Sequence, residues 1–563
     1  YFLMKKNTLM LKLFKTLLLV MVGIGPMSFA QTRYIGKSQE LQEQIDRLEA
    51  LHSSAFLNWN SFAKPYTIQN IAPFLTNLDS SYQNADAIDK YSIEKISNAY
   101  LVIPSKYDPK RSFLKSFYKN QYNGFVYNEP NIIQLAINPL LNFQVGSEKN
   151  KLSGTLVNTR GIAVNGIIVN KIAFYAAFCD NQENPFSYVD NLASKQQAFP
   201  GVDYYSKRLV NQYDYLTAQT YIQFPLVKKY IQAQIGYGKQ FWGYGQRSLY
   251  LSDYGASAPY LQLHSQFKKF SYDNLYMELT PQYTRGGGDK ALGHKYASFH
   301  HLSMQLHSKL EVGVFEAIVF GRTNHYEWSY LNPLILLRQA ERSQGSPDNA
   351  LMGFDFKWKT SRKAHFYGQL LFDEFKLKEL SQSKGWWGNK YGFQLGLKTY
   401  DLFKIPHLDA QIEFNQVRPF TYARDSASNY THYNQALAHP LGAGFRECIG
   451  ILRYQWHKKW SCSVQQVLYA KGVDTGSSNF GNNIFSAYSS RVQDYGFQTI
   501  AGVKSKGAYT NIHIAYECIP NLYLEAGFIQ RTLSYQASHL PDEKTSAVYS
   551  GIRWNMARRT VDF

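Results

Sequence analysis

Polar and apolar residues alternate with a period of two along much of this chain, and the pattern predicts β-strands. In residues 272–283, Leu275 and Met277 lie on one face of the predicted strand, and Tyr276 and Glu278 lie on the other. Successive side chains of a strand point to opposite faces, so such a segment has one apolar and one polar face. The same split recurs in residues 214–224, 231–237 and 508–518. Alternation alone does not separate a soluble sandwich from a membrane barrel.

The lengths of the connections favour a barrel. Predicted strands begin near residues 131, 153, 170, 213, 229, 258, 272, 297, 310, 350, 364, 390, 407, 444, 459, 508, 521 and 545. Short turns alternate with long segments, which are residues 181–212, 241–257, 323–349, 419–443 and 472–507. An even strand count with short periplasmic turns and long external loops is typical of outer-membrane barrels. We therefore predict an all-β transmembrane fold, an antiparallel outer-membrane β-barrel of about 18 strands over residues 126–563, with Tyr495–Lys504 in a loop.

Both ends of the chain fit export to the outer membrane. Lysines precede the apolar run 17–25, and Ser28-Phe29-Ala30 offers small residues for cleavage. We expect residues 1–30 to be a signal peptide that starts at Met4. At the other end we expect Phe563 to close the last strand. A C-terminal aromatic residue of this kind is the signal by which the barrel-assembly machinery recognises bacterial barrels.

Residues 31–125 have a helical pattern. Leu41, Ile45 and Leu48 recur at helical spacing behind Ser38, which is a suitable cap. We predict helices over Gln39–Leu51, Ile68–Leu78 and Ala85–Ala99. They form either a small periplasmic or plug domain under the barrel mouth or a loosely attached leader.

Composition supports the same class. The chain holds 44 Tyr, 36 Phe and 9 Trp among 563 residues, yet its mean hydropathy is −0.36, which argues against a helical membrane protein. The formal net charge is +19, and removal of the four lysines of the signal peptide leaves +15. Such a charge favours outer-membrane lipid, lipopolysaccharide phosphates or acidic polysaccharide as partners, whereas nucleic acid belongs to another compartment. A basic surface with no dedicated ligand is the alternative.

The four cysteines lie scattered within predicted strands. Cys179, Cys448, Cys462 and Cys518 have no metal-like spacing, so we expect lone residues of the barrel wall rather than a disulfide framework.

Several motifs resemble one protein family. The clearest is the run Phe-Trp-Gly-Tyr-Gly-Gln-Arg-Ser-Leu-Tyr-Leu-Ser over residues 241–252. Further matching stretches are Lys64-Pro65-Tyr66, Leu331-Asn332-Pro333, residues 346–353 and residues 434–447 with His439-Pro440-Leu441-Gly442. Over residues 55–563 the chain resembles the Wzi-type capsule-assembly outer-membrane proteins, and more closely their RemB-like relatives of gliding motility in Bacteroidota. Tyr244 stands where the capsule branch usually carries Pro.

The resemblance implies a fold and a task. The fold is an eighteen-stranded barrel with an N-terminal helical bundle. The capsule branch is proposed to hold polysaccharide at the cell surface as a lectin, and the other branch implies a motility or adhesion component. Capsule-export or motility proteins are the partners that the resemblance implies.

The residues themselves suggest where a glycan binds. Sugar rings stack on flat aromatic faces such as Trp242 and Tyr244, and the guanidinium of Arg247 holds carboxylates. The other interpretation places Trp242 in the interfacial aromatic belt. Further candidates for ligand contact are Trp328, Arg338, Arg424 and Arg446.

The segment 332–352 carries a charged cluster of Arg338, Glu341 and Arg342. We expect this segment to be a helical loop that folds into the lumen. There it either stabilises the fold as a plug contact or binds ligand.

Catalytic and metal sites are poorly supported. His432 and His439 lie seven residues apart with no third ligand at convincing spacing, so they make a weak zinc site. His300 and His301 are adjacent and point to opposite faces of a strand. We find no Ser, His and acid arrangement with a nucleophile elbow and predict no enzyme and no cofactor. The hypotheses are a polysaccharide-binding surface protein, an anion-favouring diffusion pore and a motility or adhesion component.

Overall fold

The structure is a computed structural model of the whole chain. It describes residues 39–52, 59–66, 71, 85–100, 124–129, 131–169, 171–207, 212–228, 230–284, 291–322, 325–334, 337–425, 427–537 and 540–563. The predicted signal peptide, residues 1–30, lies outside the described residues. So does the predicted helix Ile68–Leu78, apart from Ile71.

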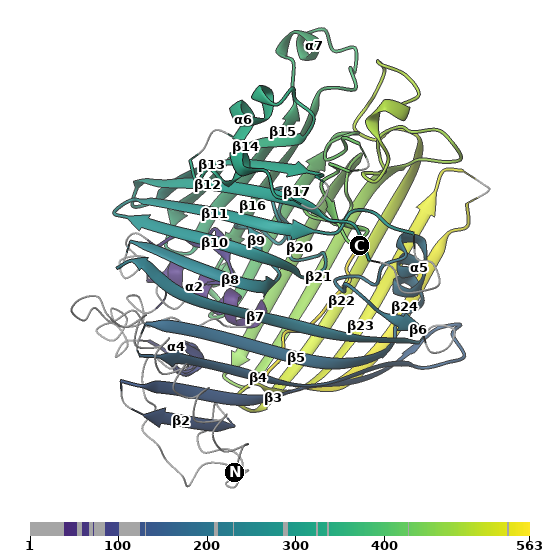
Figure 1. Cartoon of the computed structure of the whole chain (residues 1–563). Coiled ribbons are helices and arrows are strands. Elements are labelled where there is room, and N and C mark those ends of the chain that lie inside the picture. Colours follow the sequence, from purple (N-terminus) through teal and green to yellow (C-terminus); the bar gives the residue numbers. More distant parts are fainter. Residues whose placement is uncertain are drawn as a thin grey trace, which may run out of the picture.

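Eighteen long antiparallel strands form a closed barrel, which confirms the predicted fold (Figure 1). They are β3 (Ile133–Glu148), β4 (Thr155–Ile168), β5 (Ile172–Asn184), β7 (Tyr213–Val227), β8 (Ile231–Gly238), β10 (Ala258–Phe267), β11 (Phe270–Leu279), β12 (Lys295–His307), β13 (Leu310–Phe320), β14 (Asn349–Ser361), β15 (Ala364–Glu374), β16 (Lys390–Thr399), β17 (Leu408–Val417), β20 (Phe445–His457), β21 (Trp460–Val473), β22 (Val503–Ile519), β23 (Leu522–Tyr535) and β24 (Glu543–Trp554). The pairing of β24 with β3 closes the ring. Each predicted strand is present, but β22 begins at Val503, so the predicted loop Tyr495–Lys504 is wrong at its last two residues.

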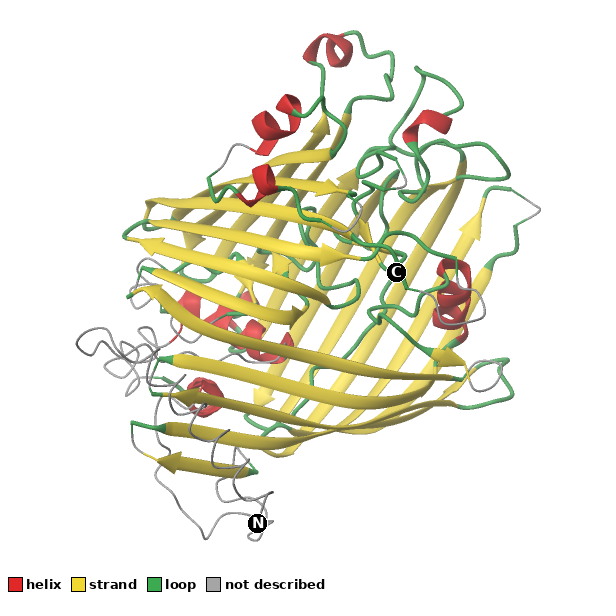
Figure 2. Cartoon of the chain, in the orientation of Figure 1, coloured by secondary structure: helices red, strands yellow, loops and turns green. Residues whose placement is uncertain are grey.

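Short elements complete the described chain (Figure 2). The short strands are β1 (Ala63–Lys64), β2 (Phe125–Glu129), β6 (Ser206–Lys207), β9 (Phe241–Trp242), β18 (Thr431–His432) and β19 (Gln435–Ala436). The helices are α2 (Gln39–Leu51), α4 (Ala87–Tyr100), α5 (Ser187–Gln196), α6 (Leu337–Ser343) and α7 (Leu377–Ser381), with 3₁₀ turns η3 (Trp328–Leu331), η4 (Leu402–Lys404) and η5 (Tyr488–Ser490). No helix in the described residues is both long enough and apolar enough to cross a bilayer.

The two faces of the wall follow the alternation in the sequence. On β22 the apolar side chains of Ile512 and Ile514 are 47% and 40% exposed, whereas Asn511 and His513 are 2% and 6% exposed. The exposed apolar face suits contact with lipid, and the polar face lines the interior of the barrel.

Tyrosine rings lie across glycines on the inner wall, which accounts for part of the tyrosine content. Tyr367 is the cross-strand partner of Gly396. A Cβ atom added to Gly396 would lie 2.1 Å from Cζ of that ring. Tyr469 and Gly507 form the same kind of pair between β21 and β22. These positions require glycine because a side chain there would occupy the volume of the ring.

Helix α2 lies inside the barrel at the end where the short turns are, and ion pairs hold it to several strands (Figure 1). The pairs are Glu40 with Arg553, Glu43 with Arg453, Asp46 with Lys398, Arg47 with Asp401 and Asp409, and Glu49 with Lys357 and Lys359. Burial alone raises the pKa of Glu49, but the attraction of Lys357 and Lys359 outweighs burial and lowers it to about 2. The acidic face of α2 therefore matches a basic stretch of wall. The helices predicted over Gln39–Leu51 and Ala85–Ala99 are confirmed as α2 and α4.

Candidate ligand-binding sites in the barrel interior

The motif of residues 241–252 folds into the lumen. Strand β9 of this motif pairs with β1, which precedes the barrel in the chain. Trp242 is 0% exposed, and its ring centroid lies 6.0 Å from that of Phe299 and 6.2 Å from that of Phe315 on the inner wall. The aromatic-belt interpretation of Trp242 is therefore wrong. The ring is enclosed by other aromatic rings, so a sugar reaches it only if this packing opens.

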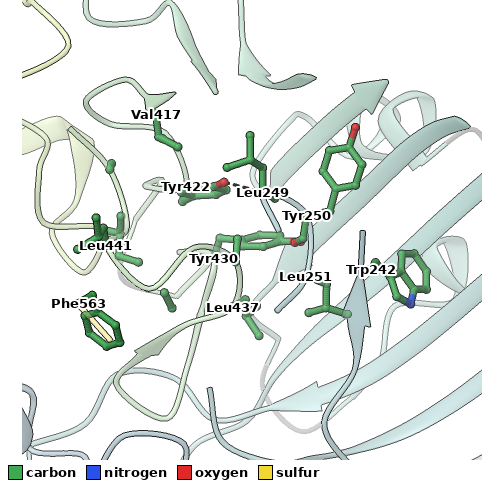
Figure 3. Close-up of a cluster of buried hydrophobic side chains, with 14 of the residues drawn as sticks. Trp242, Leu249, Tyr250, Leu251, Val417, Tyr422, Tyr430, Leu437, Leu441 and Phe563 are labelled. Atoms are coloured by element: carbon green, nitrogen blue, oxygen red, sulfur yellow. Dashed lines mark hydrogen bonds between the residues drawn. The ribbon is translucent and has the colours of Figure 1, made fainter. Parts of the chain in front are cut away.

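The same segment packs on the long loop between β17 and β20 (Figure 3). Tyr422 donates a hydrogen bond of 2.8 Å to the carbonyl oxygen of Leu249, and Tyr430 donates one of 2.6 Å to that of Tyr250. Tyr244 is 3% exposed and packs edge-on against Phe62. Two segments far apart in the sequence thus form one apolar core inside the barrel.

Arg247 is the centre of a buried ionic network. Its Nη2 atom lies 3.2 Å from Glu447 and its Nη1 atom 2.8 Å from Asp562. The backbone N–H of Arg247 donates to Glu413 on β17. Glu447 also contacts His439 at 2.7 Å. Both Nη atoms are therefore committed to carboxylates of the protein itself, whereas Nε is buried and has no hydrogen-bond partner among the described residues.

The two loop histidines have separate partners. Nδ1 of His432 accepts a hydrogen bond from the Thr280 N–H, and Nε2 contacts the Ser257 carbonyl at 3.1 Å. Burial lowers the pKa of His432 to about 4. His439 pairs with Glu447 through Nε2 and accepts from the Leu441 N–H through Nδ1. Both nitrogens of each ring are thus occupied within the fold, and the two rings do not share a metal.

The last residues of the chain lie inside the lumen rather than on the final strand. Strand β24 ends at Trp554, and the residues after it run back through the barrel interior (Figure 1). Phe563 is 7% exposed and packs edge-on against Tyr254 at 5.1 Å. Its carbonyl oxygen accepts a hydrogen bond from Arg531. The expectation that Phe563 closes the last strand is wrong, because its ring belongs to the interior core.

The segment between β13 and β14 packs on the outside of the wall and not in the lumen, which corrects the expectation for residues 332–352. Tyr330 and Leu337 pack on Tyr296, Ile318 and Phe320. These wall positions point outward because they alternate with the interior residues of the same strands. We call residues 325–334 and 337–348 the outer strap.

The outer strap covers polar groups on the outer wall. His300 pairs with Glu316 at 3.1 Å, and Glu316 accepts the N–H of Leu337 at 3.0 Å. His301, the next residue, points inward to Asp355 and stacks on Phe62, which confirms that the two histidines face opposite sides. The strap satisfies buried polar groups that would otherwise face lipid, and this requirement explains its position.

The remaining predicted site residues are dispersed. Trp328 on the outer strap is 82% exposed, and Arg338 pairs with Glu341 at 3.2 Å. Arg424 pairs with Glu374 at 2.7 Å in the long loops. Arg446 is exposed on the outward face of β20, where its Nε donates to Gln416. The structure brings Trp242, Tyr244 and Arg247 together. The other four predicted residues, Trp328, Arg338, Arg424 and Arg446, lie apart from them.

The main interior cavity lies beside strands β3, β4, β5 and β7, and Gly245, Gln246 and Arg247 of the motif also line it. Its volume is about 600 Å³. The lining combines amide, hydroxyl and aromatic groups, among them Asn142, Gln144, Asn165, Tyr175, Asn181 and Tyr549. Amides and hydroxyls match the hydrogen-bonding groups of a sugar, and tyrosine faces match its apolar side. The polar residues of each alternating strand were the signal in the sequence that could have located this lining.

Arg558 supplies a charge to this cavity. It lies in the segment after β24 and lines the cavity. Its Nε and Nη1 atoms are buried and have no hydrogen-bond partner among the described residues. Buried donors usually have an acceptor, so a rotation of the Arg558 side chain toward the cavity would let these N–H groups donate to an anionic oxygen there. Sequence reasoning missed Arg558 because nothing in the pattern indicates that the chain turns back inside.

A second cleft of about 550 Å³ lies among the long loops. Gln197, Gln282, Tyr283, Asn434 and Asn483 line it. Pro440 lines both the cleft and the interior cavity. The loop that carries His439-Pro440-Leu441-Gly442 therefore separates a polar cleft at the surface from a polar cavity within.

The four cysteines are free, as expected.

Comparison with known proteins identifies the fold. No family model and no curated protein sequence matches the chain. Among solved structures it is similar to Wzi, an outer-membrane protein involved in group 1 capsule assembly in Escherichia coli and described as a carbohydrate-binding β-barrel. The TM-score is 0.56 and the identity 12%, over 93% of this chain and 100% of that chain. The chain has a Wzi-like fold.

OprD of Pseudomonas aeruginosa is more distant from this chain. Its TM-score is 0.41 and its identity 12%, over 76% of this chain and 98% of that chain.

Proposed function

We propose that this barrel is a non-enzymatic protein that binds an anionic surface polysaccharide in its interior cavity. The observation that carries the proposal is the unpartnered guanidinium edge of Arg558 in a cavity lined by amides, hydroxyls and tyrosines. A carboxylated sugar offers hydroxyls, an apolar ring face and an anionic oxygen, and the cavity offers a partner for each. The basic net charge of the chain favours the same class of ligand.

Carbohydrate binding by Wzi supports this proposal through the shared fold. The predicted contacts Trp242, Tyr244 and Arg247 take a supporting role in it. Trp242 and Tyr244 hold the loops that form one side of the cavity. Arg247 lines the cavity, but its Nη atoms pair with Glu447 and Asp562. We propose that Arg558 and the wall amides touch the ligand. Trp328, Arg338, Arg424 and Arg446 lie outside this cavity and are proposed to act only in first contact with the glycan.

Retention of the refolded protein on an immobilised uronic-acid polysaccharide tests the proposal. We expect retention at low salt, weaker retention as salt rises, and at least tenfold weaker binding for Arg558→Gln, in line with about 1.5–3 kcal/mol for a hydrogen bond to a charged group. Arg160→Gln removes one charge from the exposed outer face of β4 and is the matched control. Equal retention of the two variants would contradict the proposal.

The other two hypotheses make different predictions. From the resemblance to the RemB-like branch, the second hypothesis is a motility or adhesion component with gliding or capsule-export proteins as partners. A deletion strain that spreads normally would count against this hypothesis. A diffusion pore requires an open lumen. The segments packed in the lumen, α2, residues 239–257 and residues 555–563, favour a closed one.

A further inference from the structure

The short turns between adjacent strands carry an unusual amount of positive charge. Apart from the turns between β2 and β3 and between β22 and β23, each short turn contains at least one described Lys or Arg. These residues are Lys171, Lys228, Lys268, Lys269, Lys309, Arg362, Lys363, Lys404, Lys458 and Lys459. We call this set the basic rim. Figure 1 shows the short turns at the end of the barrel where α2 and α4 lie.

The basic rim is accessible and little neutralised. Lys228, Lys268, Lys269, Lys309 and Lys458 are exposed. Asp401 is the acidic residue in the described part of these turns. It pairs with Lys363 and also with Arg47 of α2. The rim as a whole therefore keeps a strong positive charge, and that charge is held close together by the hydrogen-bonded strand ends.

The opposite end of the barrel has a different charge pattern. In the long loops, basic residues pair with acidic ones: Lys195 with Glu543, Arg322 with Asp348, Arg424 with Glu374 and Arg491 with Asp494. The charge asymmetry lies along the barrel axis. The long-loop end also has exposed lysines, but a larger share of its basic residues is paired with carboxylates than on the basic rim.

Aromatic side chains on the outer wall stand next to the basic rim. Phe267 is 56% exposed, and the Nζ atom of Lys268 lies 5.5 Å from the centre of its ring. Trp456 and Trp460 flank Lys458 and are 43% and 37% exposed, with ring centroids 5.9 Å apart. Further exposed rings beside the turns are Tyr230, Phe270, Trp358, Phe366 and Phe403. Aromatic girdles of this kind mark the interface between the hydrocarbon and the headgroups.

The aromatic side chains fix the depth of the basic-rim lysines relative to the bilayer. Side chains that follow an interfacial aromatic girdle reach the level of the lipid headgroups, where a long basic side chain extends its charge toward phosphate. The short turns of an outer-membrane barrel face the periplasm. The headgroups at that level are those of the periplasmic leaflet.

We infer that the basic rim is a binding surface for anionic phospholipid headgroups of the periplasmic leaflet. Phosphate oxygens accept hydrogen bonds from the ammonium groups, while the acyl chains contact the aromatic girdle. The rim thereby selects acidic lipids around this end of the barrel and holds the short turns, with the α2 contacts behind them, against the membrane surface. A cell-wall polymer is the competing anionic partner, but it would not require exposed aromatic rings beside most of the basic turns.

Quenching of tryptophan fluorescence by brominated lipid tests the inference. Full-length protein is refolded into vesicles of dibromo-phosphatidylcholine or dibromo-phosphatidylglycerol mixed with their unbrominated partners. Trp358, Trp456 and Trp460 report on the lipid beside the rim because they lie next to its turns. We expect phosphatidylglycerol to be preferred at the rim by about fivefold or more, the effect of roughly one lysine near an anionic surface.

Two triple variants separate the rim from the net charge. Lys268→Gln, Lys269→Gln and Lys458→Gln together remove three rim charges, and we expect the preference to fall toward one. Lys149→Gln, Lys378→Gln and Lys384→Gln remove three exposed charges at the long-loop end, and we expect the preference to stay. Heat-modifiability on gels verifies that both variants fold.

Two results would overturn the inference. One is an equal preference in the wild type and both variants. The other is rim-dependent sedimentation of the protein with purified peptidoglycan sacculi in the absence of lipid selectivity, which would assign the rim to the cell wall.

Discussion

Arg247 and Asp562 form an ion pair with an Nη1 to Oδ1 distance of 2.8 Å inside the barrel. The pair joins a loop that enters the lumen to the segment that follows the last strand. Glu447 on the wall accepts the other arm of the same guanidinium. One side chain therefore ties a loop, the wall and the end of the described chain together.

Replacement of Arg247 by Gln should destabilise the folded barrel strongly. Loss of one partner leaves Glu447 and Asp562 buried without their counter-charge, which costs about 3–5 kcal/mol in comparable sites. Urea unfolding in detergent micelles measures the loss. Arg491→Gln breaks an exposed pair with Asp494 and should change stability by less than about 1 kcal/mol. A similar midpoint for both variants would show that the network is dispensable.

Docking of helix α2 should weaken in acid. The pKa of Glu49 falls from its ordinary 4.5 to about 2 in the folded protein, so its ion pairs contribute stability above pH 4.5. That contribution is lost as the pH falls through the range from about 4.5 to 2. Distances between a spin label on α2 and one on the wall should broaden in this range. An unchanged distribution at pH 3 would contradict the assigned role of Glu49.

The Tyr and Gly pairs of the inner wall predict a sharp contrast between two alanine substitutions. Gly396→Ala places a methyl group inside the ring of Tyr367 and should cost about 1–3 kcal/mol. Gly450 has no neighbour within 4 Å of an added Cβ atom among the described residues, so Gly450→Ala should be nearly neutral. Thermal unfolding of the two variants side by side checks this. A neutral Gly396→Ala would mean that the ring has free space to move.

The lumen should conduct poorly. In planar bilayers we expect no steady open state for the wild type, because α2 and the inward loops occupy the lumen. The double variant Asp46→Lys and Glu49→Lys places cations against Lys398, Lys357 and Lys359, and frequent openings should result from repulsion. A stable wild-type conductance would instead favour the pore hypothesis.

The strands were predictable from the sequence because the wall imposes alternation on every one of them. Leu275 and Met277 take the interior face, with Tyr276 and Glu278 on the other, as the pattern requires. The pattern does not say which face is the interior one. In this strand the apolar side faces a packed core and not lipid, because the inward loops supply an apolar partner.

The placement of loops was not predictable. The local sequence of the outer strap predicts a helix and contains aromatic residues, but it does not indicate where the strap packs. Its position on the outer wall follows from the outward side chains of His300 and Glu316, which it covers. The same holds for Phe563 and Arg558. Their positions depend on partners hundreds of residues away, such as Tyr254 and the wall of β3–β5, and no local pattern encodes those contacts.

The account depends most on the interior cavity as the place where saccharide binds. Photo-crosslinking with a diazirine-labelled uronic-acid oligosaccharide, followed by peptide mapping, locates the contact directly. The account predicts crosslinks on the inner face of β3–β7 and on the segment that carries Arg558, with loss of both in Arg558→Gln. Crosslinks confined to the exposed long loops or to the outer strap would contradict it.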